Sequence, residues 1–543
     1  MKKIFQPLLY TAAATVILLA ASCSKKIDEA YINPNATTRV PVETLLPGII
    51  GNMVGSSSAQ GSAYGTANDG LYTGRYVQFW ATNITGNQYD RMSGATGGSD
   101  LLGSVWAMHY YGMGQNLGRM IEWADEEGKK DFVGVGYAIR AWSWLTLTNV
   151  YGEAILRQAF DANRLVFDYD SQEDIYKEVR RLCHLAISTL NSATSSSALA
   201  QGDAYFYGGD LNKWKKFAYS VLARSFNHLT NKSIYNPDSV IFYSNLGIQN
   251  LPDMAAAKFI GSGLSGTYNF FGQFRSNVGA LRQSRFIANL MTGLNPMFPG
   301  VADPRAPYII RENPNGTYRG VRPNKGTDGL VTNDQPANFW GGAFSSVAAP
   351  GTDATSRYIF RDAAPFPIIS ASEVHFMKAE AYLRKGDQTN ARQSYIDGIN
   401  ASFDMLTGTT AYHSAVPTAL QITAPARAAY LANPVVVPPV GSLTRSHIML
   451  QKYIAMYGYG IVETWVDMRR YHYTDTDPVT LQQVYADFTP PTGIDLWPDN
   501  NNKWAYRARP RYNSEFLYNI AALDLVGGRA LDYHTKEQWF SQP

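Results

Sequence analysis

Cysteine and charge are both scarce in this chain. Cysteine occurs twice in 543 residues, at Cys23 and Cys183, so a framework of disulfides is excluded. The fold must depend on a buried core, which a chain of this length can form. Charged residues make up 17%, against about 25% in typical soluble domains. The net charge of +3 falls to +1 without Lys2 and Lys3, which gives no electrostatic reason to expect a nucleic-acid partner.

The N-terminus has the features of an export signal. Lys2 and Lys3 precede an apolar stretch over residues 8–21, and small residues lead directly into Cys23. A cysteine in this place resembles a bacterial lipobox, in which the thiol is acylated and the chain is cut just before it. The alternative, an uncleaved membrane helix, requires about 20 apolar residues. We therefore expect a lipoprotein signal peptide over residues 1–22, lipidation of Cys23 and a tether over residues 23–40.

Helices are the regular element that the sequence predicts. Apolar residues recur at spacings of three and four over residues 106–120, 132–145, 175–190 and 214–229, which places them on one helical face. Cys183 lies beside one of these faces and is expected to be a buried thiol. Ser171 with Asp174 is a plausible helix start, and Ser370 with Glu373 has capping-box spacing.

Two helices of similar length are predicted around Gly386, over residues 370–383 and 387–399. Their length, their short connection and their small residues favour one tetratricopeptide-type unit, although no clean 34-residue period runs through the chain. The sequence predicts a mostly α fold over residues 41–543. We expect a single domain with a tetratricopeptide-like scaffold of helix pairs and long irregular loops that form a ligand face.

Long segments interrupt the helical pattern. Residues 51–98, 299–367 and 407–442 are rich in glycine, proline or small polar residues and are expected to be irregular. Aromatic residues reach 13% of the chain and suit flat apolar or sugar-like ligands. Among the loop residues we expect ligand contacts from Trp80, Asn87, Tyr89 and Trp340, with rings for stacking and an amide for hydrogen bonds. The alternative is that these rings pin their loops to the scaffold.

Several segments together resemble a known family. They are residues 149–153 (NVYGE), 207–218 (YGGDLNKWKKFA), 303–305 (DPR), 372–383 (SEVHFMKAEAYL), 451–453 with 463–470 (QKY, ETWVDMRR) and 509–515 (RPRYNSE). In this order behind a lipobox they resemble the SusD/RagB-type outer-membrane nutrient-binding lipoproteins. The resemblance implies a non-enzymatic receptor without cofactor or metal. It would bind a glycan or peptide at the cell surface and deliver it to a SusC-like TonB-dependent β-barrel transporter.

Two other functions stay open at the level of sequence: a lipid-anchored hydrolase acting on the same nutrients, and a helical-repeat adaptor. Glu373, His375 and Glu380 lie within eight positions, but their spacing is not that of a His-Glu-x-x-His metal site. The Gly-x-Ser-x-Gly nucleophile motif is absent. Paired carboxylates for glycoside hydrolysis depend on separation in space, so the sequence does not decide on them. We expect Arg469 and Arg470 to form ion pairs on or between helices.

Overall fold

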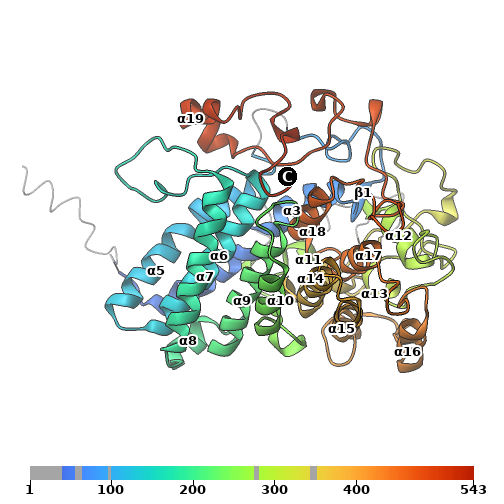
Figure 1. Ribbon diagram of the computed structural model, residues 1–543, viewed down its shortest axis with the longest axis horizontal. Coiled ribbons are helices and arrows are strands. Elements are labelled where there is room, and N and C mark those ends of the chain that lie inside the picture. The colour runs from blue at the N-terminus through green and yellow to red at the C-terminus, as the bar shows by residue number, and fades with distance from the viewer. Residues whose placement is uncertain (1–38, 56–63, 96–99, 264, 274–279, 343–350) are drawn as a thin grey trace, which may run out of the picture.

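Helices provide most of the regular structure in the computed structural model (Figure 1). The structure describes residues 39–543 except 56–63, 96–99, 264, 274–279 and 343–350. Cys23, the expected signal peptide and nearly all of the expected tether lie outside the described residues. Strands in the described part form two short antiparallel pairs, β1 (Trp80–Thr82) with β3 (Leu281–Gln283) and β2 (Ala255–Ala257) with β4 (Phe366–Ile369). The prediction of a mostly α fold is confirmed.

The first half of the chain forms a row of packed helices. They are α5 (Gly114–Glu126), α6 (Lys130–Tyr151), α7 (Gln172–Asn191), α8 (Ser197–Gly202), α9 (Leu211–Asn227) and α10 (Pro237–Leu246). The Ser171 side chain accepts a hydrogen bond from the Asp174 N–H at 3.1 Å, so the predicted helix start is confirmed. The four predicted helical faces fall within this row and the elements just before it. Cys183 is buried, as expected, and burial raises the pKa of its thiol.

Asp203 organises the turn that leads into α9. Its carboxylate accepts hydrogen bonds from the backbone N–H groups of Tyr207 and Gly209 and from Nε1 of Trp214, at 2.8–3.0 Å. Asp210 then caps the helix by accepting from two backbone N–H groups of its first turn. The segment 207–218 therefore has a structural role, because its polar groups fix the entry of a buried helix.

The predicted helix pair is present as α14 (Ala371–Arg384) and α15 (Gln388–Leu406). Gly386 adopts a φ of 80° between them, and Gly398 lies against the ring of Phe376 so closely that a Cβ atom would be 2.9 Å from it. The expected capping box is half right. Ser370 accepts from the Glu373 N–H, but the Glu373 carboxylate binds Arg224 of α9 instead of returning to Ser370. The tetratricopeptide-like arrangement as a whole stays a prediction.

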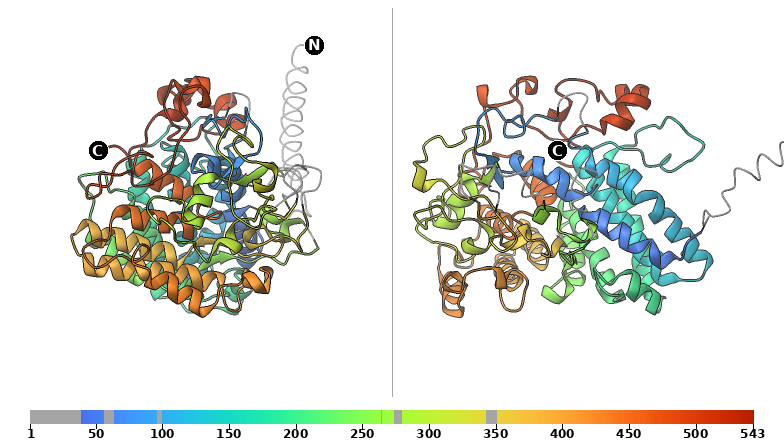
Figure 2. Two further views of the ribbon diagram at one scale, coloured as in Figure 1. Left: turned by 90° about the vertical axis from the view of Figure 1, so that its right-hand side faces the viewer. Right: turned by 180° about the vertical axis from the view of Figure 1, so that it is seen from behind.

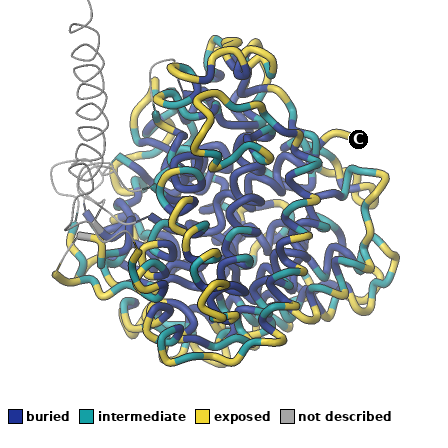
Figure 3. Tube along the Cα trace, turned by 90° about the vertical axis from the view of Figure 1, so that its left-hand side faces the viewer, coloured by how far each residue is buried: buried dark blue, intermediate teal, exposed yellow. Residues whose placement is uncertain are grey.

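Buried ion pairs join the helices in the centre of the molecule. Arg470 of α18 (Ile461–Arg470) contacts Glu380 of α14 at 3.0 Å and Asp467 at 2.6 Å, and Lys452 of α17 (Arg445–Ala455) contacts Asp467 at 2.7 Å. Burial alone would raise the pKa of Glu380, but the charges of Arg470 and Arg384 hold it well below its usual range. The expected ion pairing is confirmed for Arg470 but not for Arg469, whose guanidinium donates to the backbone carbonyls of Trp465 and Tyr506. Both arginines are buried, and Figure 3 shows that buried segments fill the interior of the molecule.

Parts of the segments expected to be irregular are helical. They contain α3 (Thr66–Tyr76), α13 (Ala306–Ile309), α16 (Ala424–Ala432) and the last turn of α2 (Leu46–Val54). Helix α3 is rich in residues of low helix propensity, but burial overrides propensity there. A Cβ atom on Gly74 would lie 2.4 Å from the indole of Trp80, and one on Gly70 would lie 2.6 Å from Ile461. These two glycines are needed because the helix is packed closely against its neighbours.

Several loops lie together along the upper edge of the molecule in Figure 1, which we call the loop edge. Residues 155–170, the C-terminal turn η12 (Tyr512–Phe516) and α19 (Ile520–Leu525) share this edge in Figure 1 and in both views of Figure 2. Helix α4 (Ser104–Ala107) and the π-helical turn η2 (Met108–Gly112) directly precede α5. Helices α11 (Phe270–Gln273) and α12 (Arg285–Thr292) lie further along the chain. No helix among the described residues is long and apolar enough to span a bilayer.

Candidate functional site

The two tryptophans expected to contact ligand have no exposed surface. Trp80 and Trp340 are both 0% exposed and belong to one aromatic cluster that includes Phe271, Phe339 and Phe360. The indole N–H of Trp80 donates to the backbone of Leu71, and that of Trp340 donates to the backbone of Phe271 at 2.8 Å. The expectation of open ring faces is therefore wrong. These rings fix their loops to the core. Burial against other apolar side chains stabilises the rings more than an exposed position in solvent would.

Tyr89 and Asn87 also serve the structure of their own loop. Tyr89 is 4% exposed, and its ring lies 4.4 Å from that of Tyr72 and 5.8 Å from the guanidinium of Arg75. The Asn87 carboxamide accepts from the Tyr89 N–H at 3.0 Å and the Asp90 N–H at 3.4 Å, which closes a tight turn. Asn87 is half-buried, and its contact with a ligand stays a prediction.

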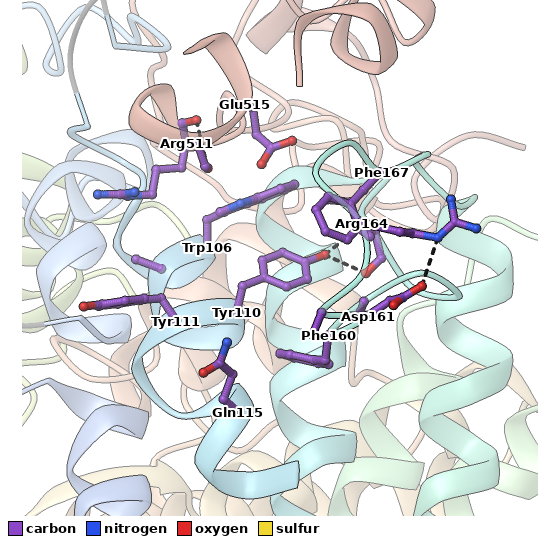
Figure 4. Close-up of a pocket in the computed structure, with 15 residues that line it drawn as sticks. Trp106, Tyr110, Tyr111, Gln115, Phe160, Asp161, Arg164, Phe167, Arg511 and Glu515 are labelled. Atoms are coloured by element: carbon purple, nitrogen blue, oxygen red, sulfur yellow. Dashed lines mark hydrogen bonds and ion pairs between the residues drawn. The ribbon is translucent and has the colours of Figure 1, made fainter. Parts of the chain in front are cut away.

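A cavity of about 420 Å³ lies at the loop edge, and we refer to it as the aromatic cavity (Figure 4). Three segments that are distant in sequence form its walls. The side chains that give it its chemical character are Trp106, Tyr110, Tyr111, Gln115, Phe160, Asp161, Arg164, Phe167, Arg511 and Glu515. Its volume falls within the range of roughly 300–1,000 Å³ typical of small-molecule sites. An aromatic lining with polar groups at the rim is typical of a binding site.

The π-helical turn η2 presents two of the aromatic rings, Tyr110 and Tyr111, and α4 just before it presents a third, Trp106. The Met113 N–H donates to the Met108 carbonyl, five residues back, at 3.0 Å, and the wider turn changes the direction of successive side chains. Trp106 is buried with its ring 5.0 Å from Tyr110, whereas Tyr111 is 74% exposed. The Tyr111 ring meets Tyr64 edge to face at 5.6 Å. Tyr111 therefore has an open face beside the cavity.

Phe160 forms the opposite wall from the loop 155–170. Its φ of 66° is unusual for a bulky residue, and such backbone strain persists where surrounding contacts hold it. The ring lies 6.1 Å from both His109 and Tyr110 and 5.4 Å from the guanidinium of Arg140, yet it is 37% exposed. Phe160 is thus held firmly in place while part of its ring faces solvent.

Hydrogen bonds fix this loop at its base. The Tyr110 hydroxyl donates to the Ile155 carbonyl and accepts from the Ile155 N–H, both at 2.8 Å. Asp170 pairs with Ala154 through two backbone hydrogen bonds, and its carboxylate accepts from the N–H groups of Leu156 and Arg157. The base of the loop is therefore ordered before any ligand binds.

The C-terminal segment closes the third side. Asn519 exchanges two hydrogen bonds with the backbone of Phe167, at 3.0 and 2.9 Å. The Tyr169 hydroxyl donates to the Glu515 carboxylate at 2.5 Å, and Asn519 also donates to that carboxylate at 2.9 Å. Glu515 is only 4% exposed, so these bonds occupy a buried carboxylate and join the two segments.

The two cations of the described cavity lining are each paired with a carboxylate. Arg164 contacts Asp161 at 3.1 Å, and Arg511 contacts Asp100 at 2.6 Å. A hydrogen bond from the Asn163 N–H and the contact with Arg164 lower the pKa of Asp161. No cation in the described lining is left without a carboxylate, so the cavity favours an uncharged ligand with an apolar face and polar edges.

Sequence reasoning missed this site for a physical reason. Trp106 and Tyr110 fall on the helical face predicted over residues 106–120, and Trp106 is buried, yet both rings also line the cavity. The one available signal was the adjacent pair Tyr110 and Tyr111, since neighbouring residues on a regular helix do not share one face. The loop and the C-terminal segment carry no recognisable motif for a ligand.

The acidic residues considered for a metal site have other partners. Glu373 binds Arg224 at 2.5 and 2.6 Å, Glu380 binds Arg470, and Nε2 of His375 lies 2.9 Å from the carbonyl of Gln249. They face different neighbours in the core and do not converge. Among the described residues, no group of three or more histidine, cysteine, aspartate or glutamate side chains could hold a metal ion.

Solved structures share this fold at low sequence identity. A SusD/RagB family protein from Bacteroides thetaiotaomicron is 20% identical, with a TM-score of 0.63 over 93% of this chain and 99% of that one. A SusD homologue from Bacteroides uniformis is 19% identical, with a TM-score of 0.67 over 92% and 99%. A chitin-binding SusD homologue from Flavobacterium johnsoniae is 16% identical, with a TM-score of 0.61 over 92% and 98%.

No curated protein matches the sequence. A family model, SusD-like and described as "Starch-binding associating with outer membrane", matches residues 34–490. This match includes most of the chain, and the fold agrees with that of the solved SusD homologues. The chain therefore belongs to the SusD-like family.

Proposed function

We propose that the protein binds an uncharged glycan at the cell surface, in the aromatic cavity, and delivers it to a TonB-dependent outer-membrane transporter. The observation that carries the proposal is the pair of partly exposed rings, Tyr111 and Phe160, on two walls of one cavity. Sugar rings have apolar faces that stack on aromatic rings, and their hydroxyl groups need hydrogen-bond partners such as Gln115 and Ser514 at the rim.

Family membership and the relatives support a glycan as the ligand. The family description names starch, and the Flavobacterium johnsoniae relative is named as chitin-binding. Both polymers are uncharged or nearly so along their backbone, which agrees with the paired charges of the cavity. A peptide is the other ligand class that the sequence left open, and the experiment below includes it.

The chemistry of the cavity favours binding over hydrolysis. Its two carboxylates are Asp161 and Glu515. A glycosidase needs one protonated carboxyl as general acid, but hydrogen bonding lowers the pKa of Asp161 and keeps it ionised. Glu515 is buried and accepts from Tyr169 and Asn519. We propose on this basis that the protein is not an enzyme, and family membership is the reason to expect no cofactor.

The membrane arrangement is proposed from the sequence and the family. Cys23 would carry lipid that anchors the protein in the outer membrane, facing the exterior, and a SusC-like β-barrel would be its partner. Arg39, the first described residue, contacts Glu126 at 2.6 Å at the end of α5 and Glu127 at 2.8 Å just after it. Arg39 therefore lies near the end of α5.

The ligand is tested by exposing the protein to immobilised neutral glycans and peptides, followed by titration of the best binder. Tyr111→Ala and Phe160→Ala should each weaken binding about tenfold, because a stacking surface is lost. Tyr205→Ala is the matched control, since Tyr205 is 47% exposed and does not line the cavity. Unchanged affinity in both cavity variants would remove the aromatic cavity as the site, and a preference for peptides would exclude a glycan.

The partner is tested by purifying the tagged, lipidated protein from its native outer membrane in mild detergent. We expect a large β-barrel transporter in comparable amount, identified by mass spectrometry. Cys23→Ala should release the protein from the membrane fraction, because the acylated thiol is removed. Recovery of the protein alone, under conditions that preserve other outer-membrane complexes, would contradict delivery to a transporter.

A further inference from the structure

A second cavity, of about 230 Å³, lies beside the beginning of α12 and shares no lining residue with the aromatic cavity. Helix α12 lies on the right in Figure 1, away from α6. Its charged lining residues are Arg285, Arg322, Lys325, Asp487 and Asp495. We refer to it as the cationic cavity. Three separate chain segments bring these groups together, and binding of a neutral glycan in the aromatic cavity does not involve them.

The three cations of this cavity keep contact with solvent. The side chains of Arg285, Arg322 and Lys325 are 42%, 41% and 37% exposed. The nearest carboxylate to Arg285 is Asp487, at 3.8 Å, which is too long for a hydrogen bond. The Arg285 guanidinium therefore has donors available for a ligand that enters the cavity.

The two carboxylates in the lining are engaged by other donors. Asp495 accepts from Lys325 at 2.6 Å and from the side-chain amide of Asn324 at 3.0 Å. Asp487 accepts from the side-chain amide of Asn289 at 2.7 Å. These bonds reduce the capacity of both carboxylates to neutralise a further cation, and they hold Lys325 at the cavity.

The surroundings carry an excess of positive charge. Arg91 adds a fourth cation. Its guanidinium donates hydrogen bonds to the backbone carbonyls of Ile494 and Leu496, the residues on either side of Asp495. Asp328, paired with Arg322, adds a third carboxylate, which leaves one positive charge in excess. Burial would raise the pKa of Asp495, but the hydrogen bonds from Lys325 and Asn324 and the charges of Lys325 and Arg91 lower it.

We propose that the cationic cavity binds an oxyanion group on a saccharide, either the carboxylate of a uronic acid or the sulfate of a sulfated sugar. A guanidinium donates two parallel hydrogen bonds to such a group, which Arg285 and Arg322 can supply from different segments. The carboxamide of Gln78 and the hydroxyl of Thr492 line the same cavity and suit the hydroxyl groups of one sugar ring. The volume limits the bound part to about one monosaccharide unit.

This site would select its ligand differently from the aromatic cavity. The aromatic cavity has paired charges and exposed rings, whereas the cationic cavity has unequal charge and Phe286 as its only aromatic lining residue. The proposal does not depend on the neutral-glycan function. Variants at Arg285 test one site and variants at Tyr111 test the other, so failure of either can be recognised separately.

Calorimetric titration of the whole protein at low and moderate salt tests the proposal. The probes are trigalacturonate, neutral galactotriose, a sulfated galactose disaccharide and inorganic sulfate. Arg285→Gln and Arg322→Gln are the test variants, and Arg319→Gln is the matched control, because Arg319 is exposed and lies outside this cavity. Melting temperatures confirm that each variant is folded.

We expect an acidic saccharide to bind and galactotriose not to bind at this site. Each test variant should weaken acidic binding at least about tenfold, Arg319→Gln and Tyr111→Ala should leave it unchanged, and added salt should reduce it. Binding of trigalacturonate alone would identify a carboxylate, and binding of the sulfated sugar alone would identify a sulfate. The proposal is overturned by absence of acidic binding, by equal binding in both test variants, or by inorganic sulfate that binds as tightly as the saccharides.

Discussion

Aromatic side chains have two roles in this molecule, and burial separates them. Trp80 and Trp340 hold loops onto the core through ring contacts and indole hydrogen bonds. Tyr111 and Phe160 also lie in contact with other rings, but part of each ring faces the aromatic cavity. All four occur near glycine or small polar residues in the sequence, so composition alone does not tell one role from the other.

Replacement of Trp80 by alanine tests its structural role. We expect Trp80→Ala to lower the free energy of unfolding by about 3–5 kcal/mol, because it removes a large buried side chain and leaves a cavity. Urea denaturation measures the change. Tyr111→Ala is the control and should change stability by less than about 1 kcal/mol, since its ring is largely exposed. Equal stability of the two variants would contradict the assignment of Trp80 to the core.

His472 makes stability depend on pH in the alkaline range. Hydrogen bonds to Asp475 at 2.7 Å and Glu537 at 2.9 Å raise its pKa to about 10. The protonated form is stabilised in the folded state, so its contribution is complete below about pH 6.5 and is lost as pH rises through about 10.

Wild-type protein should therefore lose stability between pH 7 and pH 10 more steeply than His472→Gln. We expect a difference of about 1 kcal/mol, a reduced value because a third of the side chain is exposed and solvent screens the pair. Denaturation with urea at both pH values measures it. Parallel loss of stability in the two proteins would show that His472 contributes nothing in this range.

At the scale of the helices, buried ion pairs connect α9, α14, α17 and α18. Glu380 is 1% exposed. Its carboxylate forms ion pairs with Arg470 and Arg384 and accepts a hydrogen bond from the hydroxyl of Tyr471. When one partner of such a group is removed, the remaining charge stays buried without an opposite charge beside it. This lowers the free energy of unfolding more than the loss of an exposed ion pair does.

Glu380→Ala should accordingly destabilise the protein by about 3–5 kcal/mol, as measured by urea denaturation. Glu173→Ala is a matched control, because Glu173 pairs with Lys177 at 2.8 Å on the exposed side of α7 and its loss should cost less than about 0.5 kcal/mol. A small effect of Glu380→Ala would mean that the ion pairs do not hold these helices together.

The helices were predictable where periodicity and capping agree, as in α7 with Ser171 and in the α14–α15 pair. Helix α3 was not predictable, because Gly70 and Gly74 lower its helix propensity. The reason for glycine at these two positions is close packing against Ile461 and Trp80, which only the structure reveals. The aromatic cavity could not be predicted either. Its walls come from residues near 106–111, 155–170 and 511–515, and their proximity is a property of the fold.

At the scale of the whole molecule, packed helices form a frame, and the loop 155–170 lies beside the C-terminal segment along the upper edge of that frame (Figure 1). Loops on a rigid frame are a common place for binding sites, since their side chains vary while their bases stay fixed. Here the base of loop 155–170 is fixed by Tyr110 and Asp170. A surface receptor benefits from this arrangement, because less ordering is required when the ligand binds.

The central claim is that a glycan occupies the aromatic cavity. Hydrogen–deuterium exchange, with and without the glycan selected in the binding screen, tests it most directly. We expect increased protection of backbone amides over residues 104–112 and 155–170 and around η12, with little change in α14 and α15. Protection confined to other parts of the molecule, or no change in these three segments at saturating glycan, would contradict the claim.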